Sequence, residues 1–492
     1  MSEFENNNFS GNPEQPQQNP NPAGAPQQNF NPAGAPQQPV YSAPMNEYYP
    51  SQGTDGNQDN KKKIIMAVAA VAAIIIVVLL FKGIFSGSSK DEAENLFDDG
   101  MLIFGEKEEY ETRWGSKQTK YKYGIINEKG KVIIDADYDA IGFVGEGRIV
   151  AGEWEKTDDG AEMVTMLRDK KGKEVSDDEL SQSAVYQYFS EGLLPVCEDD
   201  EWGFMNKNGK WVIKPSFYSV GNFVDGVAPA KEDEDDEWGY INKKGKWVIE
   251  PDFDSAGEFV DGLAIASKNG KYGFINKKGD WKVKRKYSSL YHFADNGLAA
   301  ACDDGEWGYI NKKGEWVIEN EYADAYSFTE DGLALVKDGS KYGYINKKGK
   351  MVIDDDYVEA SSFSNGLAYV KEDADDDYGY INKKGEMVID ADFTSARSFN
   401  KDGVAAVKDG DEWGFINKKG KWVIDPEFKY ASSFHDDGYA LVCTGDDDNS
   451  DDDEYFVINK KGKSVFKDTF DALETYSAME YNYNFDEDED ED

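Results

Sequence analysis

Cysteine and histidine are scarce in this sequence, with three cysteines and two histidines among 492 residues. So few cysteines exclude a disulfide framework. Cys197, Cys302 and Cys443 occupy one position of a repeated pattern and stand whole repeats apart, so we expect free thiols at a half-exposed site. No histidine or further cysteine stands near them in the sequence. The sequence therefore predicts no metal site and no cofactor.

The two histidines, His292 and His435, belong to no recognisable catalytic pattern. Neither has a serine or cysteine partner in a triad motif, and phosphate-loop, zinc-protease and dinucleotide-binding fingerprints do not occur in the chain. We interpret both histidines as surface loop residues and predict that the protein is not an enzyme. An enzyme acting on glycans stays open as a lesser alternative, because carboxylates are numerous and their spacing in sequence does not reveal their separation in space.

Positive charge is in short supply. The chain has 97 acidic and 54 basic residues, which gives a formal net charge of −43 at pH 7. A surface of this sign repels DNA and RNA, because nucleic-acid binding needs a basic face that releases counterions. We therefore exclude nucleic acid as a partner.

Long apolar runs are nearly absent, and the one exception lies between Ile64 and Phe81. This run has no polar side chain and would extend roughly 27 Å as a helix, close to the thickness of a membrane's hydrocarbon core. It predicts a transmembrane helix. A cleaved signal peptide is the alternative, disfavoured because sixty residues precede the run and no small-residue cleavage site follows. The lysines at 61–63 place the amino-terminal side in the cytoplasm and the rest of the chain outside.

The first 60 residues contain no lysine or arginine and hold ten of the fifteen prolines. Such a segment has too little apolar area to build a core and is predicted to be disordered. The domain boundaries predicted from these shifts in composition are a tail over 1–60, a transmembrane helix with its lysine flank over 61–85, a short linker over 86–96, a repeat array over 97–483, and an acidic tail over 484–492.

What the chain does contain is a repeat. An aromatic residue followed by glycine recurs every 34 to 36 residues, at Trp202, Trp238, Tyr272, Trp307, Tyr342, Tyr378 and Trp413. A turn that begins with asparagine or aspartate and ends three residues later with glycine occurs ten times, which predicts ten copies. A period this regular indicates small structural units that bury their faces against one another.

One copy, starting at Trp238, is predicted to form three strands, over 238–242, 246–249 and 263–266. Gly245 supplies the positive φ of the first turn, and Pro251 ends the second strand. Each unit is then an antiparallel meander. We expect an all-β tandem array of about ten three-stranded repeats in an open solenoid or superhelix. A closed β-propeller is the alternative, disfavoured because ten blades exceed the usual four to eight.

The pattern WGYIN, KxGK, VIxPxF and DGLA resembles the bacterial WG-repeat family, also written KWG, from Tyr123 to about Gly462. The resemblance implies a β-rich repeat architecture without a general enzymatic activity. Trp and Tyr faces can also stack on sugars, but a residue required at one strand position in every copy is more often packed between units. We therefore interpret the repeated aromatic residues as core.

Charge is sorted between two sets of turns. The loops after the third predicted strand are acidic, as over 232–237, 372–377, 409–412 and 446–454. The asparagine-to-glycine turns carry paired lysines, and stacking would place them along the opposite edge. The candidate ligand-binding residues on this edge are Lys243, Lys244, Lys277, Lys278, Lys312, Lys313, Lys347, Lys348, Lys383, Lys384, Lys418 and Lys419.

Together these features predict a non-enzymatic binding or scaffold module at the bacterial cell envelope. It would cross the membrane once and bind an envelope protein or wall polymer, with edge-to-edge self-association as a further option. A single-pass sensor that relays an outer signal to the cytoplasmic tail is the alternative, and an enzyme acting on envelope glycans ranks third. The identity of the ligand is not predicted.

Overall fold

The computed structural model describes residues 96–97, 100–111, 117–157, 160–176, 180, 184, 187–445, 453–474 and 477–479. The chain divides into two units, of which the first, Met1–Ala35, lies outside the described residues and the second, Pro36–Asp492, contains all of them. The predicted tail over 1–60, membrane segment over 61–85 and acidic tail over 484–492 also lie outside them and stay predictions. In the described ranges, no helix is both long enough and apolar enough to cross a membrane.

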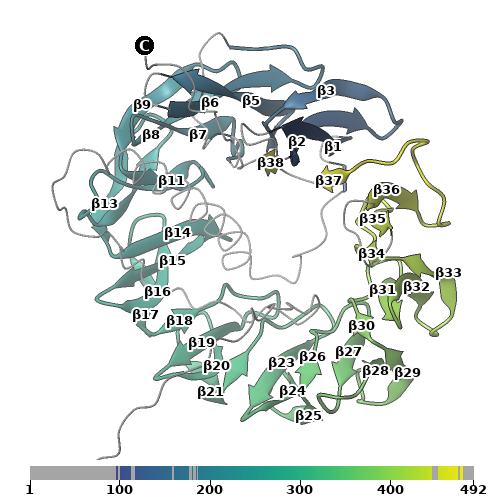
Figure 1. Ribbon diagram of the computed structural model, residues 1–492. Helices are drawn as coiled ribbons and strands as arrows, with labels where there is room; N and C mark the ends of the chain where they lie inside the picture. The colour runs from purple at the N-terminus through teal and green to yellow at the C-terminus, as the bar shows by residue number, and fades with distance from the viewer. Residues whose placement is uncertain are drawn as a thin grey trace, which may run out of the picture. The chain divides into compact units, whose positions relative to one another are not determined.

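The described residues of the second unit form ten small antiparallel sheets, here called blades 1 to 10, that follow one another around a ring (Figure 1). The elements in these ranges are strands, so the all-β prediction is confirmed, as is the number of copies inferred from the turns. The first strands of the blades, such as β14 and β30, lie toward the centre of the ring, and β17 and β33 lie at its outer rim (Figure 1).

The blades contain the following strands. Blade 1 has β1 (Met101–Glu111), β2 (Lys117–Asn127), β3 (Val132–Tyr138) and β37 (Ala472–Glu474), and blade 2 has β4 (Ala140–Gly145), β5 (Arg148–Thr157), β6 (Gly160–Asp169) and β38 (Ser477–Met479). Blade 3 has β7 (Leu193–Glu198), β8 (Glu201–Asn206) and β9 (Trp211–Phe217), and blade 4 has β10 (Ser219–Val220), β11 (Val227–Lys231), β12 (Trp238–Asn242) and β13 (Trp247–Phe253). Blade 5 has β14 (Ser255–Val260), β15 (Leu263–Lys268), β16 (Lys271–Asn276) and β17 (Trp281–Tyr287), and blade 6 has β18 (Ser289–Leu290), β19 (Ala299–Asp303), β20 (Glu306–Ile310) and β21 (Trp316–Tyr322). Blade 7 has β22 (Asp324–Ala325), β23 (Leu333–Asp338), β24 (Lys341–Asn346) and β25 (Met351–Tyr357), and blade 8 has β26 (Glu359–Ala360), β27 (Leu367–Lys371), β28 (Tyr378–Asn382) and β29 (Met387–Phe393). Blade 9 has β30 (Ser395–Ala396), β31 (Val404–Asp409), β32 (Glu412–Asn417) and β33 (Trp422–Phe428), and blade 10 has β34 (Tyr430–Ala431), β35 (Tyr439–Thr444) and β36 (Glu454–Asn459).

The predicted three-stranded unit is wrong in two respects. Eight of the ten blades have four strands. In blades 4 to 9 the segment interpreted as a connection contributes an inner strand, and in blades 1 and 2 the fourth strand is β37 or β38. The predicted unit also crosses a blade boundary, since its first two strands are β12 and β13 of blade 4 while its third is β15 of blade 5. The sequence repeat and the blade therefore have the same length but different starting points.

Pro251 does not end its strand, because β13 continues to Phe253. Between the pairs Trp238 with Phe253 and Tyr240 with Ile249, β13 contains an extra two residues, which make a bulge. β13 is the outermost strand of blade 4, so a proline there removes no hydrogen bond from the sheet.

The turn between β12 and β13 forms as predicted. Gly245 has a φ of 69°, and its amide donates to the carbonyl of Asn242 at 2.8 Å. The side-chain oxygen of Asn242 accepts from the amide of Lys244 at 2.9 Å. Asparagine at the first position and glycine at the fourth therefore close the turn, which places two lysines at its tip.

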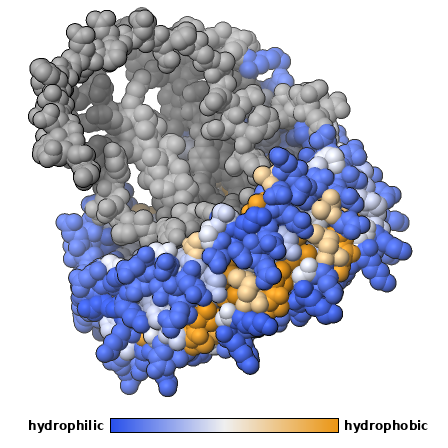
Figure 2. Space-filling view, turned by 90° about the horizontal axis from the view of Figure 1, so that it is seen from below, coloured by the Kyte–Doolittle hydropathy of each residue, from blue (hydrophilic) through white to orange (hydrophobic). Residues whose placement is uncertain are grey.

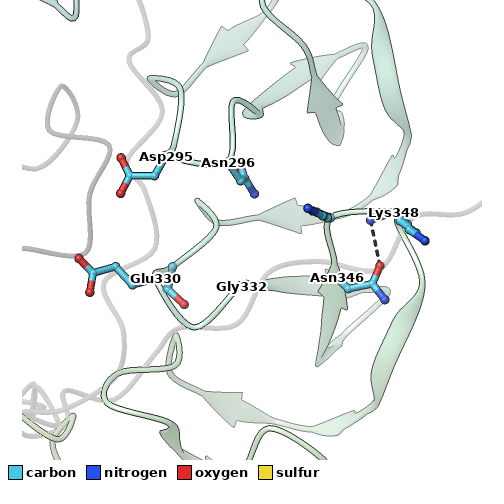
Figure 3. Close-up of a pocket in the computed structure, with 8 residues that line it drawn as sticks. Asp295, Asn296, Glu330, Gly332, Asn346 and Lys348 are labelled. Atoms are coloured by element: carbon cyan, nitrogen blue, oxygen red, sulfur yellow. Dashed lines mark hydrogen bonds between the residues drawn. The ribbon is translucent and has the colours of Figure 1, made fainter.

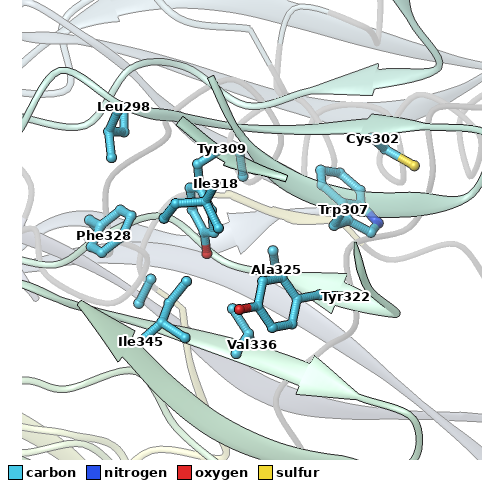
Figure 4. Packing of buried hydrophobic residues seen from close by; sticks show 12 residues of the cluster. Leu298, Cys302, Trp307, Tyr309, Ile318, Tyr322, Ala325, Phe328, Val336 and Ile345 are labelled. Atoms are coloured by element: carbon cyan, nitrogen blue, oxygen red, sulfur yellow. The ribbon is translucent and has the colours of Figure 1, made fainter. Parts of the chain in front are cut away.

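The hydrophobic core lies between blades. Ten clusters of buried residues occupy the ten junctions, including the junction between blades 10 and 1. At the junction of blades 6 and 7, for example, Trp307 and Tyr309 of β20 pack with Val336 of β23 and Ile345 of β24 (Figure 4). Trp307 is 2% exposed and Tyr342 is 5% exposed, so the core interpretation of the repeated aromatic residues holds for these copies.

The ring closes, which contradicts the open solenoid and confirms the closed β-propeller alternative. β37 pairs with β1 in blade 1, and β38 pairs with β4 in blade 2. Leu473 of β37 joins Leu102 and Phe104 of β1 in one buried cluster. The carboxyl-terminal strands thus complete the first two blades, a step that no single repeat of the sequence encodes.

Candidate binding site on the lysine-turn face

The two kinds of charged turn lie at opposite ends of the same strands. β12 begins after the acidic loop at 232–237 and ends at the lysine turn formed by 242–245. The same order holds at β28, which follows the acidic loop at 372–377. The structure thus separates acidic loops and lysine turns onto the two faces of the ring, here called the acidic-loop face and the lysine-turn face. Most of the acidic stretch at 446–454 lies outside the described residues.

The lysine-turn face is nevertheless not a bare cationic ridge. The turn that ends at a glycine such as Gly192 or Gly226, just before a strand such as β7 or β11, lies on the same face. In several blades its acidic residue pairs with the first lysine of the next blade. The ammonium nitrogens of Lys243, Lys277 and Lys383 lie 3.0, 2.9 and 3.1 Å from carboxylate oxygens of Glu191, Asp225 and Asp331. Lys418 donates to the side-chain oxygen of Asn365 at 3.0 Å. These four lysines therefore connect neighbouring blades.

The second lysines of the turns have a different environment. The backbone amides of Lys244, Lys278, Lys313, Lys348, Lys384 and Lys419 donate to the asparagine that begins each turn. Their side chains are exposed, and only Lys384 is near a carboxylate, that of Glu386 at 4.0 Å, among the described residues. Cations on this face are thus supplied mainly by the second lysines, with one on each of blades 4 to 9.

Two neighbouring junctions, those between blades 5 and 6 and between blades 6 and 7, depart from this pattern among the described residues. Asn296 stands where the preceding blades and blade 7 have an acidic residue, and its side-chain oxygen accepts from the amide of Leu298 in its own turn at 3.0 Å. Lys347, which would be its partner in the next blade, makes no ion pair with any described residue. Lys312, one blade earlier, likewise has no ion pair there, and its ammonium lies 5.8 Å from the ring centroid of Phe293.

A cleft of about 720 Å³ opens at the second of these junctions, between blades 6 and 7. Its lining includes Asp295, Glu330, Lys347 and Lys348. Figure 3 shows the carboxylates of Asp295 and Glu330 together on one side and Lys348 across from them. The cleft therefore presents negative and positive groups on opposite walls, an arrangement suited to a ligand that carries both charges.

The sequence prediction named Lys347 and Lys348 among twelve equivalent lysines, and the structure brings this pair to a cleft. It missed Asp295, Asn296 and Glu330. Asparagine at position 296 is visible in the sequence, but its meaning depends on knowing that the equivalent residues Glu191, Asp225 and Asp331 contact lysines 52 residues later.

The expectations for cysteine and histidine need correction. The three cysteines are free, but Cys302 and Cys443 are buried rather than half-exposed. Burial raises the pKa of the Cys443 thiol to about 11, which disfavours the reactive thiolate. His292 is not a surface loop residue, because it is 3% exposed between blades. Among the described residues, no cluster of three or more His, Cys, Asp or Glu side chains is arranged to hold a metal ion.

The fold and this face define the class of protein as a closed, propeller-like repeat protein that presents the turns of successive blades on a common surface. The family model described as "WG containing repeat" matches eight stretches, at 123–151, 202–234, 238–272, 272–307, 307–342, 342–374, 378–413 and 413–446. These stretches cover more than half of the chain, which belongs to the WG-repeat family. A β-rich repeat protein of this kind suggests a binding or scaffold module.

Several solved structures are distantly similar. A eukaryotic initiation factor is similar over 78% of this chain and 99% of its own, with 11% identity and a TM-score of 0.40. Hsv2 of Kluyveromyces lactis is similar over 55% of this chain and 94% of its own, with 9% identity and a TM-score of 0.27. PorZ, a bacterial surface component of the type IX secretion system of Porphyromonas gingivalis, is similar over 66% of this chain and 51% of its own, with 12% identity and a TM-score of 0.22. At these scores the similarities carry no functional information. No curated protein matches this sequence.

Proposed function

We propose that this WG-repeat protein is a non-enzymatic binding scaffold at the bacterial cell envelope, held by a single membrane span with its ring outside. Its binding site is the cleft between blades 6 and 7 on the lysine-turn face. The observation that supports this assignment is the cleft itself, where Lys347, without an ion pair to a described residue, and Lys348 lie opposite two carboxylates.

The chemistry of the cleft favours a ligand with both charges. The exposed carboxylates of Asp295 and Glu330 attract an amino group, and the exposed ammonium groups of Lys347 and Lys348 attract a carboxylate or phosphate. An envelope protein segment with neighbouring basic and acidic residues fits this arrangement, as does a wall polymer that carries both amino and acidic groups. Such contacts are exposed and therefore salt-sensitive.

The proposal is tested by capture with the immobilised full-length chain from solubilised envelope protein and from purified wall polymer, at low and at high salt. We expect salt-sensitive capture by the unchanged chain and its loss in the double variant Lys347→Glu and Lys348→Glu. The control is Lys312→Glu and Lys313→Glu, which makes the same change of charge one blade earlier, outside the cleft. Equal capture by both variants would assign binding elsewhere and overturn the proposal.

A further inference from the structure

The outer strands of the ring share a pattern of exposure. In β13, β21, β25, β29 and β33, the second, fourth and sixth residues are exposed to solvent. The second residue is valine in all five strands, with exposures of 38 to 47%. The fourth and sixth are carboxylates: Glu250, Asp252, Glu319, Glu321, Asp354, Asp356, Asp390, Asp392, Asp425 and Glu427. Apolar patches accordingly interrupt the largely hydrophilic described surface in Figure 2.

β17 in blade 5 reverses this pattern. Its second, fourth and sixth residues are Lys282, Lys284 and Lys286, and Arg285 between the last two is exposed as well. A chain with a net charge of −43 thus places four cations on one strand of seven residues. The strands on either side of it along the rim, β13 and β21, are acidic at the same positions.

These four cations are not neutralised by any ion pair within the described part of the chain, in contrast to Lys243, which connects two blades. Aromatic rings support two of them. The guanidinium carbon of Arg285 lies 5.7 Å from the ring centroid of Trp281, and the ammonium nitrogen of Lys286 lies 5.8 Å from that of Trp316. Ring faces hold the cations near the strand without removing their charge.

β17 also has a free edge. It is the last strand of its sheet and pairs only with β16 among the described strands. The outer strands β9, β13 and β33 contain Pro215, Pro251 and Pro426, which withhold an amide from any incoming strand, whereas β17 has Arg285 at that position. The outward edge of β17 thus has no partner strand in the described ranges and no proline that would withhold an amide from one.

We infer that the free edge of β17 binds an acidic, extended segment of a partner protein, which adds to blade 5 as a fifth strand. Alternate residues of a strand are about 6.6 Å apart, so carboxylates at every second residue of the incoming segment match the spacing of Lys282 and Lys284. The bulge between Val283 and Tyr287 exposes Arg285 and Lys286 beside them. Backbone hydrogen bonds supply the geometry, and the opposite charges select the partner. Lysines at an edge discourage pairing with a basic strand, and the same lysines favour an acidic one.

A second copy of this chain is a poorer occupant. One seven-residue strand on a convex rim buries far less than the roughly 1,200 Å² of a stable interface between folded proteins. Two copies would also each bring the large negative charge of the whole chain. A short acidic segment avoids most of that repulsion, and we expect weak, salt-sensitive binding.

The test uses the full-length chain and a fluorescent peptide of alternating glutamate and valine, with binding followed by anisotropy at several salt concentrations. The key variant is Lys282→Val with Lys284→Glu and Lys286→Glu, which gives β17 the residues that β21 carries and therefore keeps the fold. The control is Lys244→Gln with Lys278→Glu and Lys313→Glu, which makes the same net change of charge on the lysine-turn face. We expect at least a tenfold loss of affinity in the β17 variant and little change in the control.

A second peptide tests the strand geometry. Methylation of the amides on one edge of the peptide removes the donors that pair with β17 and keeps the charge, and we expect this peptide to lose binding. Equal binding of the methylated peptide would show a charged patch without strand addition and would overturn the inference. Equal affinity of the β17 variant and the unchanged chain for the unmodified peptide would also overturn the inference. Concentration-dependent assembly of the chain that disappears in the β17 variant, without peptide binding, would replace the acidic partner with a second copy and also overturn it.

Discussion

At the scale of single residues, Gly308 shows why glycine follows the aromatic residue in each repeat. A Cβ atom on Gly308 would lie 2.6 Å from the carbonyl oxygens of Ile318 and Glu319. These are backbone atoms of β21, where the bulge brings the outer strand close over its neighbour. The glycine is therefore required by a close approach of two backbones and not by a positive φ.

Gly308→Ala is expected to lower the free energy of unfolding by about 2 kcal/mol, because the outer strand must shift to admit the methyl group. Urea denaturation followed by tryptophan fluorescence measures the effect. Glu306→Ala in the same strand is the control, because Glu306 is exposed. Equal urea midpoints for the two variants would mean that β21 shifts without a loss of stability, which would contradict the close approach as the reason for glycine.

His292 makes the ring sensitive to acid. Burial disfavours the imidazolium and lowers the pKa of His292 to about 4, while the Asp261 carboxylate acts in the opposite direction. The unfolded chain takes up this proton from about pH 6.5 downward. The stabilisation that comes from keeping His292 neutral in the folded chain is thus fully present above that pH and is lost as the pH falls toward 4.

His292→Ser is expected to remove this part of the pH dependence. Ser327 and Ser362 occupy the same position in the next two blades, so the substitution has precedent in the chain. The measurement is the difference in unfolding free energy between the unchanged chain and the variant from pH 7 to pH 4, which cancels the titration of the shared carboxylates. A difference that stays constant over this range would exclude the proposed role of His292.

At the scale of elements, a tyrosine connects successive blades. The hydroxyl of Tyr344 in β24 donates to the carbonyl of Ser361, which follows β26 in the next blade, at 2.7 Å. Tyr240, Tyr309 and Tyr380 make the same hydrogen bond to their next blades. Each of these tyrosines therefore joins a middle strand of one blade to the inner segment of another.

Tyr344→Phe is expected to reduce stability by about 1 kcal/mol, since it leaves a buried carbonyl without its donor. Phe204, Phe274 and Phe415 stand at this position in other copies, so the ring itself fits without the hydroxyl. Tyr430→Phe, at an exposed tyrosine, is the control and should change little. An equal loss of stability in both variants would show that the hydrogen bond between blades is not the cause.

Elements were predictable from the sequence where local chemistry decides them. The turn from Asn242 to Gly245 and the strand at 238–242 follow from residue type and alternation alone. The inner strands were missed because a strand such as β22 has two residues, too few for a period to show. The end of β13 was misjudged because Pro251 is tolerated only on an outer edge, and the sequence does not reveal which strand is outermost.

At the scale of the whole molecule, closure depends on two short strands near the carboxyl terminus. β37 and β38 pair with β1 and β4, which lie more than 300 residues earlier in the chain. Their pairing converts an array with two free ends into a ring in which every blade has two neighbours.

A chain that ends at Asp471 lacks β37 and β38, and we expect its ring to open between blades 10 and 1. Amide hydrogen exchange in β1 and β4 should accelerate, because both strands lose a partner. A chain that ends at Met479 is the control, since it keeps both strands and lacks only the residues beyond them. Unchanged exchange in the shorter chain would mean that these strands do not close the ring.

Features that arise within a single repeat follow from the order of its residues: the all-β character, the ten copies and the lysine turns, because turn chemistry and apolar alternation act over a few residues. Among the repeated aromatic residues, Trp307, Tyr342, Tyr378 and Trp413 are buried, whereas Trp202, Trp238 and Tyr272 are half-buried. Features that depend on many repeats at once arise only when the blades pack. Closure depends on the accumulated rotation of ten junctions and on two strands from the far end of the chain. The pairing of Lys383 with Asp331, and the cleft at the junction where Lys347 makes no such pair with a described residue, arise because a turn meets its neighbour's turn only after the blades have packed.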